Sequence, residues 1–169
     1  MKRALIILVV GIASVSVAPL WGAANKPVVP PPSAPEEKHP EIDAYNAGCS
    51  LLKKQKWAEA QAKFETALKM KEAFAEAHNN LGYVLRKQSA QNYPASLVYY
   101  NRAIELAPRM AEPYMYRGAL FVFMGRMDLA EADYVTLQKL RSSLAGRLKK
   151  VIDSGKEDGS DYPGVSRSK

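Results

Sequence analysis

Small and aromatic residues recur along the chain at a spacing typical of paired helices. Three glycines are each followed, 16 or 18 residues later, by an aromatic residue: Gly48 by Phe64, Gly82 by Tyr100 and Gly118 by Tyr134. The glycines and the aromatic residues both recur at intervals of 34 or 36 residues. The second half of each unit keeps a strict +3, +4, +3 spacing: Trp57-Ala60-Phe64-Ala67, Tyr93-Ser96-Tyr100-Ala103 and Met127-Ala130-Tyr134-Leu137. That spacing places these residues on one helix face, and the fixed period indicates a stacked repeat array.

The pattern predicts an all-α fold of three helix pairs followed by an end helix. No stretch alternates apolar and polar residues as a strand would. The middle unit has two extra residues, which we assign to a loop over residues 88–94, where a bulge leaves the stack undisturbed. After the third pair, residues 142–152 predict an amphipathic helix, capped by Ser142 or Ser143 and ended by Gly155, that shields the last apolar surface.

The N-terminal residues have the features of a secretory signal peptide over residues 1–24. Lys2 and Arg3 precede an apolar run over 4–20, and the small residues Gly22-Ala23-Ala24 follow it. The alternative interpretation is an uncleaved membrane anchor. Under both interpretations the protein is exported, to the periplasm or cell envelope, and the second adds a membrane tether.

The rest of the chain divides by composition. Residues 25–40 contain six prolines and predict an extended spacer. The repeat domain is predicted over 41–154, with units at 41–74, 75–110 and 111–144 and a capping helix at 142–154. The polar residues 155–169 are predicted to be a disordered tail.

Charge and cysteine content narrow the function classes. The formal net charge is +7, and a run without acidic residues near the C-terminus carries Lys139, Arg141, Arg147, Lys149 and Lys150. We interpret this run as the solvated face of the end helix, with contact to an anionic membrane surface as the alternative. Nucleic acid is not expected as a partner, since no recognition motif is present. The single cysteine, Cys49, is expected to pack in the core, with a reactive thiol as the alternative.

The sequence shows no constellation for catalysis, and we predict that the protein is not an enzyme. His39 lies in the spacer and His78 in a helix seam, where it is expected to pack in the core. There is no glycine-rich phosphate loop, and the carboxylates are scattered over helix surfaces. No cofactor and no metal site are therefore predicted.

The repeat units resemble the tetratricopeptide repeat family. The segments AHNNLGYVL (77–85) and YYNRAIELAP (99–108) are similar to the consensus of its first and second helices. The resemblance spans residues 41 to about 144 and implies a superhelix whose first helices line a concave groove. Some family members grip a chaperone's C-terminal carboxylate there, but of that residue set only Asn80 matches, so this partner is not supported.

The resemblance and the helical spacing together give a candidate binding groove. The groove residues are predicted to be Tyr45, Asn79, Tyr83, Arg86, Met115 and Arg126. Cys49, Leu52, Ala119 and Val122 share these helix faces but are expected to pack between helices. The predicted function is an exported adaptor or scaffold that binds a protein or peptide partner and assists an envelope assembly. The alternative is a structural protein that self-associates into an oligomer.

Overall fold

The structure, a computed structural model, describes residues 38–157. Regular structure in this part of the chain is entirely helical, which confirms the predicted all-α class. The helices are α1 (Pro40–Lys53), α2 (Trp57–Met70), α3 (Ala75–Gln88), α4 (Tyr93–Leu106), α5 (Glu112–Phe123), α6 (Met127–Lys139) and α7 (Leu144–Ser154), with a short 3-10 helix, η1 (Ala90–Asn92), before α4. The predicted signal peptide, nearly all of the spacer and most of the predicted tail lie outside the described residues.

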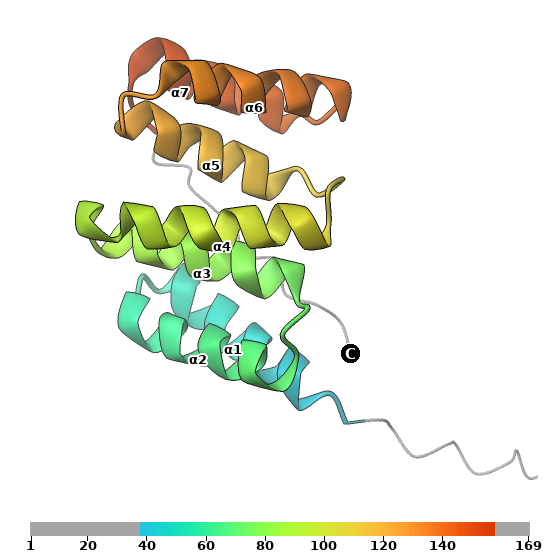
Figure 1. The fold of residues 1–169 in the computed structure, drawn as a ribbon. Coiled ribbons are helices and arrows are strands. Elements are labelled where there is room, and N and C mark those ends of the chain that lie inside the picture. The colour runs from blue at the N-terminus through green and yellow to red at the C-terminus, as the bar shows by residue number, and fades with distance from the viewer. Residues whose placement is uncertain (1–37, 158–169) are drawn as a thin grey trace, which may run out of the picture. The chain divides into compact units, whose positions relative to one another are not determined.

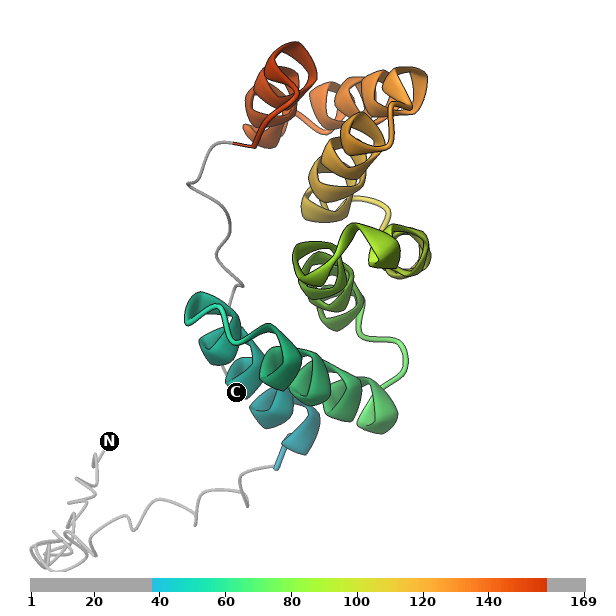
Figure 2. The same cartoon turned by 90° about the vertical axis from the view of Figure 1, so that its left-hand side faces the viewer.

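Successive helices stack in chain order from α1 to α7 (Figure 1). Each odd-numbered helix also touches the next odd-numbered one, from α1 to α3, α5 and α7. Within residues 38–157, by contrast, no close backbone contact joins α2 to α4 or α4 to α6. The row α1, α3, α5 and α7 is therefore the shorter, inner side of a curved stack, and Figure 2 shows this curvature.

In the first and second repeats, the two helices of the pair meet where a glycine of one helix lies against an aromatic ring of the other. A Cβ atom added at Gly48 would come within 2.6 Å of Phe64 Cε1, and one added at Gly82 would come within 3.0 Å of Tyr100 Cε1. Phe64 and Tyr100 are fully buried. The paired helices can approach this closely because glycine has no side chain, as the repeat pattern predicts.

The third repeat departs from the predicted register. A Cβ atom at Gly118 would meet Leu148 of α7 at 2.5 Å and the Cβ atom of Asp133 at 3.3 Å. Tyr134, the aligned aromatic residue, is only half-buried, whereas Asp133 is 2 % exposed. Because α7 takes the place of a next repeat, its leucine fills the space over Gly118 and the aromatic ring is not needed there.

The turns show how the chain accommodates the two extra residues of the middle repeat. Gln55 and Gly125, each seven positions after a repeat glycine, adopt the left-handed conformation at φ 56° and 71°. Ser89, the equivalent residue of the middle repeat, is extended, and η1 follows it. The expected loop over 88–94 is therefore corrected: η1 occupies its centre, and α4 begins at Tyr93 with Pro94 in its first turn.

The end helix covers the last repeat. α7 begins two residues later than predicted, and Leu148, Val151 and Ile152 are buried against α5 and α6. Gly155 ends it in the left-handed conformation, with its N–H donated to the Val151 carbonyl at 2.8 Å. The turn after Gly155 directs the chain away from the α7 axis.

Candidate protein-binding face

The inner row of helices carries a buried arginine at its centre. In α3, residues 79, 83 and 86 share one helix face because their spacing is four and then three residues. Arg86 is 5 % exposed, and its guanidinium carbon lies 5.2 Å from the ring centre of Tyr83. The rings of Tyr116 and Phe123, both on α5, lie 5.8 and 5.7 Å away. The three aromatic rings stabilise the charge through cation–π contacts and hold the guanidinium group in place.

Glu157, which follows α7, is the described counter-charge of Arg86. One carboxylate oxygen accepts a hydrogen bond from Arg86 Nη1, and the other accepts one from Lys87 Nζ at 3.1 Å. The side chains of Arg86 and Glu157 are 2 % and 10 % exposed, so the pair is largely shielded from water. Arg86 Nε and Nη2 have no hydrogen-bond partner in the described structure. The arginine thus has more donors than its present partner uses.

The electrostatics keep Arg86 charged. Burial opposes the charged form, but the surroundings of Arg86, the Glu157 carboxylate among them, outweigh it and leave the pKa of Arg86 above its ordinary value. Burial also raises the pKa of the Tyr100 hydroxyl, which therefore stays neutral at physiological pH. A permanent positive charge in aromatic surroundings is suited to binding a carboxylate.

A second polar cluster links α1 to α3. Asn80 Nδ2 donates to the Tyr45 hydroxyl at 3.1 Å and approaches Cys49 Sγ at 3.5 Å. Asn79 Nδ2 donates to Asn80 Oδ1 at 3.1 Å, and Asn79 Oδ1 has no hydrogen-bond partner in the described structure. The cluster is buried and fixes how the first two repeats pack.

Cys49 is expected to react slowly with thiol reagents. Burial raises the pKa of its thiol, and hydrogen bonds with Tyr45 and Asn80 offset this only in part, so the reactive thiolate is scarce. We predict that alkylation by iodoacetamide at pH 7.5 is at least about 100-fold slower in the folded chain than in urea, because the thiol must first be exposed by local opening. Mass spectrometry of timed samples measures the rate. Equal rates in the two states would support the alternative of a reactive thiol.

The six predicted groove residues occupy different surroundings. Tyr83 and Arg86 lie together, and Asn80 connects Tyr45 with Asn79. The Tyr45 ring also packs at 5.8 and 4.9 Å from the rings of Phe64 and Phe74. Met115 lies in the core of the third repeat, and Arg126 is exposed in the turn before α6, 3.9 Å from Asp128. Five of the six are buried in this state, and their role in binding stays a prediction.

Sequence analysis placed Tyr83 beside Arg86 but did not assign Tyr116, Phe123 or Glu157 to the surroundings of Arg86. Tyr116 stands one repeat of 36 residues after Asn80, so comparison of repeat positions could have placed it on the inner row. Glu157 is 71 residues from Arg86 and lies outside the periodic pattern, so no signal in the sequence could have joined the two.

The residues expected to pack between helices do so, and His78 packs as predicted. Cys49, Leu52 and Ala119 are buried, and Val122 is half-buried in the core of the third repeat. The His78 ring stacks on Tyr99 with its centre 5.9 Å away, and Nε2 donates to the Glu72 carbonyl at 2.8 Å. Burial lowers the pKa of His78.

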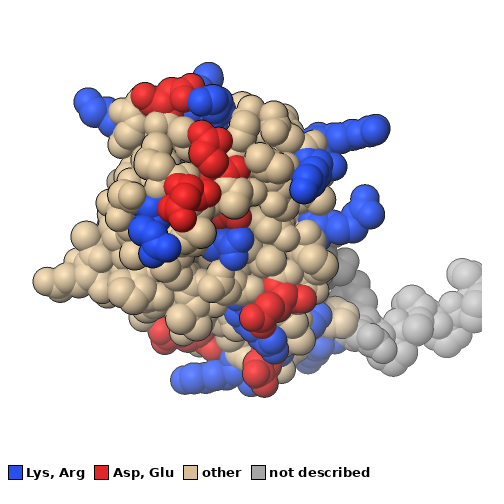
Figure 3. All heavy atoms as spheres, turned by 45° about the horizontal axis from the view of Figure 1, so that its top comes forward, with Lys and Arg blue, Asp and Glu red and all other residues tan. Residues whose placement is uncertain are grey.

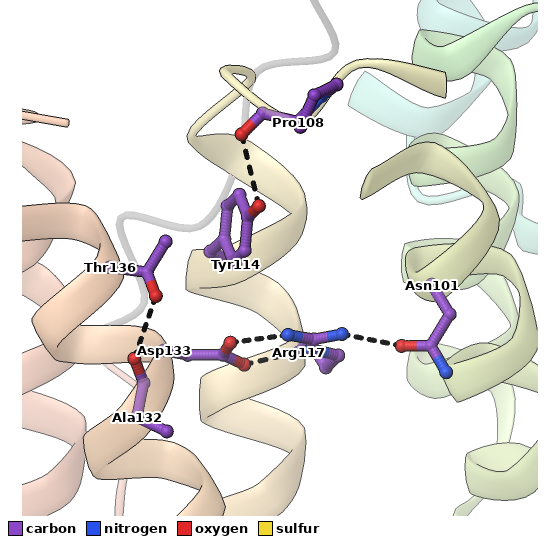
Figure 4. Close-up of polar contacts among 7 residues, drawn as sticks. All are labelled: Asn101, Pro108, Tyr114, Arg117, Ala132, Asp133 and Thr136. Carbon is purple, nitrogen blue, oxygen red and sulfur yellow. Dashed lines mark hydrogen bonds and ion pairs between the residues drawn. The ribbon is translucent and has the colours of Figure 1, made fainter. Parts of the chain in front are cut away.

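The carboxylates are not all on the surface, which corrects the sequence prediction. Asp133 is buried and accepts two hydrogen bonds from Arg117, which also donates to Asn101 on α4 (Figure 4). Arg117 thereby joins the second and third repeats. In residues 38–157 we find no cluster of three or more histidine, cysteine, aspartate or glutamate side chains that could hold a metal ion.

Charges of both signs are exposed at the C-terminal end of the stack. Acidic side chains lie among the basic ones over much of the face seen in Figure 3. On α7, Lys149 pairs with Asp153. Contact of the basic run with an anionic membrane surface stays an untested alternative to a solvated helix face. None of the helices in the described part has the length and apolar character required to cross a bilayer.

Comparison with known proteins identifies the repeats. Residues 45–111 match the model of the tetratricopeptide repeat family. Together with the helix pairs described above, this match identifies residues 45–111 as tetratricopeptide repeats, as the sequence pattern indicates. No curated protein sequence matches the chain closely enough to count as a relative.

Solved structures share the fold at low sequence identity. The first repeat domain of Spaghetti (RPAP3), bound to the HSP90 peptide SRMEEVD, superposes with a TM-score of 0.62 at 16 % identity, over 70 % of this chain and 94 % of that one. The Yersinia enterocolitica type III secretion translocator chaperone SycD gives 0.61 at 13 %, over 71 % and 95 %. PcrH in complex with the chaperone binding region of PopD gives 0.58 at 19 %, over 66 % and 87 %. These similarities confirm the fold of the described helices.

Proposed function

We propose that this chain is an exported adaptor that binds a protein or peptide partner along the inner row of helices and assists an assembly in the cell envelope. The observation that carries the proposal is Arg86, a buried and permanently charged side chain on the inner row that uses only part of its hydrogen-bonding capacity. A site of this kind suits a ligand with a carboxylate beside apolar groups. Export rests on the basic, apolar and small-residue order of residues 1–24.

Structures of the same fold support the binding part of this proposal. RPAP3 holds an HSP90 peptide, and PcrH holds the chaperone binding regions of PopD and PopB. The HSP90 peptide itself is a poor candidate for this chain. Asn80 is the one residue that matches the family's carboxylate-binding set, and its amide already bonds with Tyr45 and Cys49.

Photo-crosslinking in the cells that make the protein tests the proposal. A photoreactive amino acid replaces Lys87, which adjoins Arg86 on α3, and in a matched control it replaces Val98, which is 65 % exposed on α4. We expect adducts with a partner from position 87 and far fewer from position 98. Equal yields from both positions, or none from position 87, would contradict binding at the inner row. Cell fractionation of the same samples tests export.

The same experiment separates the adaptor from the self-association alternative. An adduct between two copies of this chain at position 87 would favour the oligomer. Light scattering on a sizing column then gives the oligomeric state directly. A monomer at all concentrations, together with an adduct to a different protein, supports the adaptor.

A further inference from the structure

The last residue that the structure describes, Glu157, lies against the candidate binding face of the same chain. α7 packs on α5 and α6, and the left-handed Gly155, at φ 66°, turns the backbone out of the helix. Two residues later, Glu157 reaches Arg86 and Lys87 on α3, which are 71 and 70 residues earlier in the chain. The segment after α7 therefore approaches the inner row at two adjacent basic side chains, Arg86 and Lys87.

The contact between Arg86 and Glu157 leaves binding capacity unused. A guanidinium group can hold a carboxylate through two parallel hydrogen bonds, from Nε and one Nη or from both Nη atoms. Glu157 takes one hydrogen bond from Arg86, at Nη1, and gives its second oxygen to Lys87. Arg86 Nε and Nη2 remain without a hydrogen-bond partner in the described structure, although Arg86 is 5 % exposed. Unsatisfied buried donors of this kind point to a ligand that could use them.

Because Arg86 is charged, a partner is expected to bind most favourably if an acidic group of its own replaces the Glu157 carboxylate. An arginine buried among the rings of Tyr83, Tyr116 and Phe123 cannot lose its proton, and leaving it without a counter-charge is costly. A partner without an acidic group would have to displace Glu157 and leave the buried charge unpaired. A partner with an acidic group replaces the lost contact and can add the second hydrogen bond.

We propose that Arg86 is the carboxylate-binding site of the inner row, that Glu157 is its internal occupant, and that an acidic side chain of a partner peptide displaces Glu157 on binding. This inference rests on the proposed function and specifies the chemistry of its ligand. Since an internal competitor reduces apparent affinity by the fraction of time it occupies the site, removal of the Glu157 charge is expected to tighten peptide binding by about tenfold or more.

The test uses the full chain, its Glu157→Gln variant and an Asp153→Asn control. Asp153 is an exposed carboxylate near the end of α7 that pairs with Lys149 and not with the inner row. Nuclear magnetic resonance of the arginine Nε–H groups reports the internal contact. We expect the Arg86 signal to shift in Glu157→Gln and to stay unchanged in Asp153→Asn. An unchanged Arg86 signal in Glu157→Gln would contradict occupancy by Glu157.

The binding arm uses a phage-displayed library of random dodecapeptides as the probe. We expect Glu157→Gln to enrich peptides that contain aspartate or glutamate and to bind them at least about tenfold more tightly than the unmodified chain and the Asp153→Asn control do. Replacing the acidic residue of a recovered peptide by its amide should abolish this gain. Arg86→Gln, once circular dichroism shows that it is folded, should lose the preference for acids, but the result from Glu157→Gln stands without it.

The outcomes separate this inference from the proposed function. Peptides that bind the inner row with equal affinity in all variants, or with no preference for acids, would overturn the inference and leave the proposed function standing. A library that yields no binder to any variant would count against both.

Discussion

Replacing Arg117 by methionine is expected to lower the free energy of unfolding by about 3 kcal/mol, because it leaves the buried Asp133 carboxylate without its partner. Asp133 is 2 % exposed and accepts hydrogen bonds from Arg117 Nε at 3.0 Å and Nη2 at 2.6 Å. The same arginine bonds Asn101 at 2.7 Å, so the substitution also weakens the seam between repeats two and three. Urea unfolding followed by circular dichroism at pH 7 measures the loss.

The pH dependence of this variant checks the cause. Burial raises the pKa of Asp133, and Arg117 opposes that rise only in part. A folded pKa above the unfolded value means that ionisation opposes folding as the pH rises through the folded value. Without Arg117 this penalty grows, so the deficit should be largest near pH 7 and shrink toward about pH 4.

A double substitution serves as the control for the Arg117 prediction. Arg117→Met combined with Asp133→Leu should recover much of the lost stability, because no charge is then left buried. A deficit that does not vary with pH, and that the second substitution does not relieve, would assign the loss to packing and not to the unpaired carboxylate.

The second large effect is expected for Phe64→Ala, which should lower the free energy of unfolding by about 3–5 kcal/mol. The Phe64 ring is fully buried and fills the space beside Gly48, with the Tyr45 ring 5.8 Å away. Its removal opens a cavity between α1 and α2 that the close backbone contact at Gly48 cannot easily close. The urea midpoint by circular dichroism measures the change.

Two further variants separate cavity formation from general loss of apolar surface. Val98→Ala, at a position that is 65 % exposed, should change stability by no more than about 0.5 kcal/mol. Gly48→Ala should be destabilising alone, since its Cβ meets the Phe64 ring, and less so when Phe64 is shortened to leucine. A near-neutral Phe64→Ala would contradict the packing that we assign to the first repeat.

The periodic part of the fold could be predicted from the sequence, because packing between adjacent helices leaves a local signal. Gly48 with Phe64 and Gly82 with Tyr100 show that signal, and the structure places both pairs in contact. The repeat alignment predicts that Tyr134 is the buried aromatic residue of the third repeat, but the buried residue is its neighbour, Asp133. Here Leu148 from the end helix fills the space over Gly118, a contact that the repeat pattern does not contain.

The candidate site could be predicted only in part. Helical spacing placed Tyr83 and Arg86 on one face of α3, and the structure shows them in contact. Glu157 could not be found, because a contact between a periodic helix and a segment 71 residues later leaves no spacing pattern. Burial of Tyr45 was missed because its ring also packs on Phe74, which precedes α3 and has no place in the repeated +3, +4, +3 spacing.

Nuclear magnetic resonance of methionine methyl groups and arginine Nε–H groups tests the central claim that the inner row binds the partner. The segment recovered by crosslinking at position 87 is titrated into the full chain labelled at methionine methyl groups and arginine Nε. Met115 lies on α5 of the inner row, whereas Met70 is 54 % exposed at the end of α2. We predict that the Arg86 and Met115 signals shift on binding and that the Met70 signal does not. A shift at Met70 with Arg86 and Met115 unchanged would contradict the account.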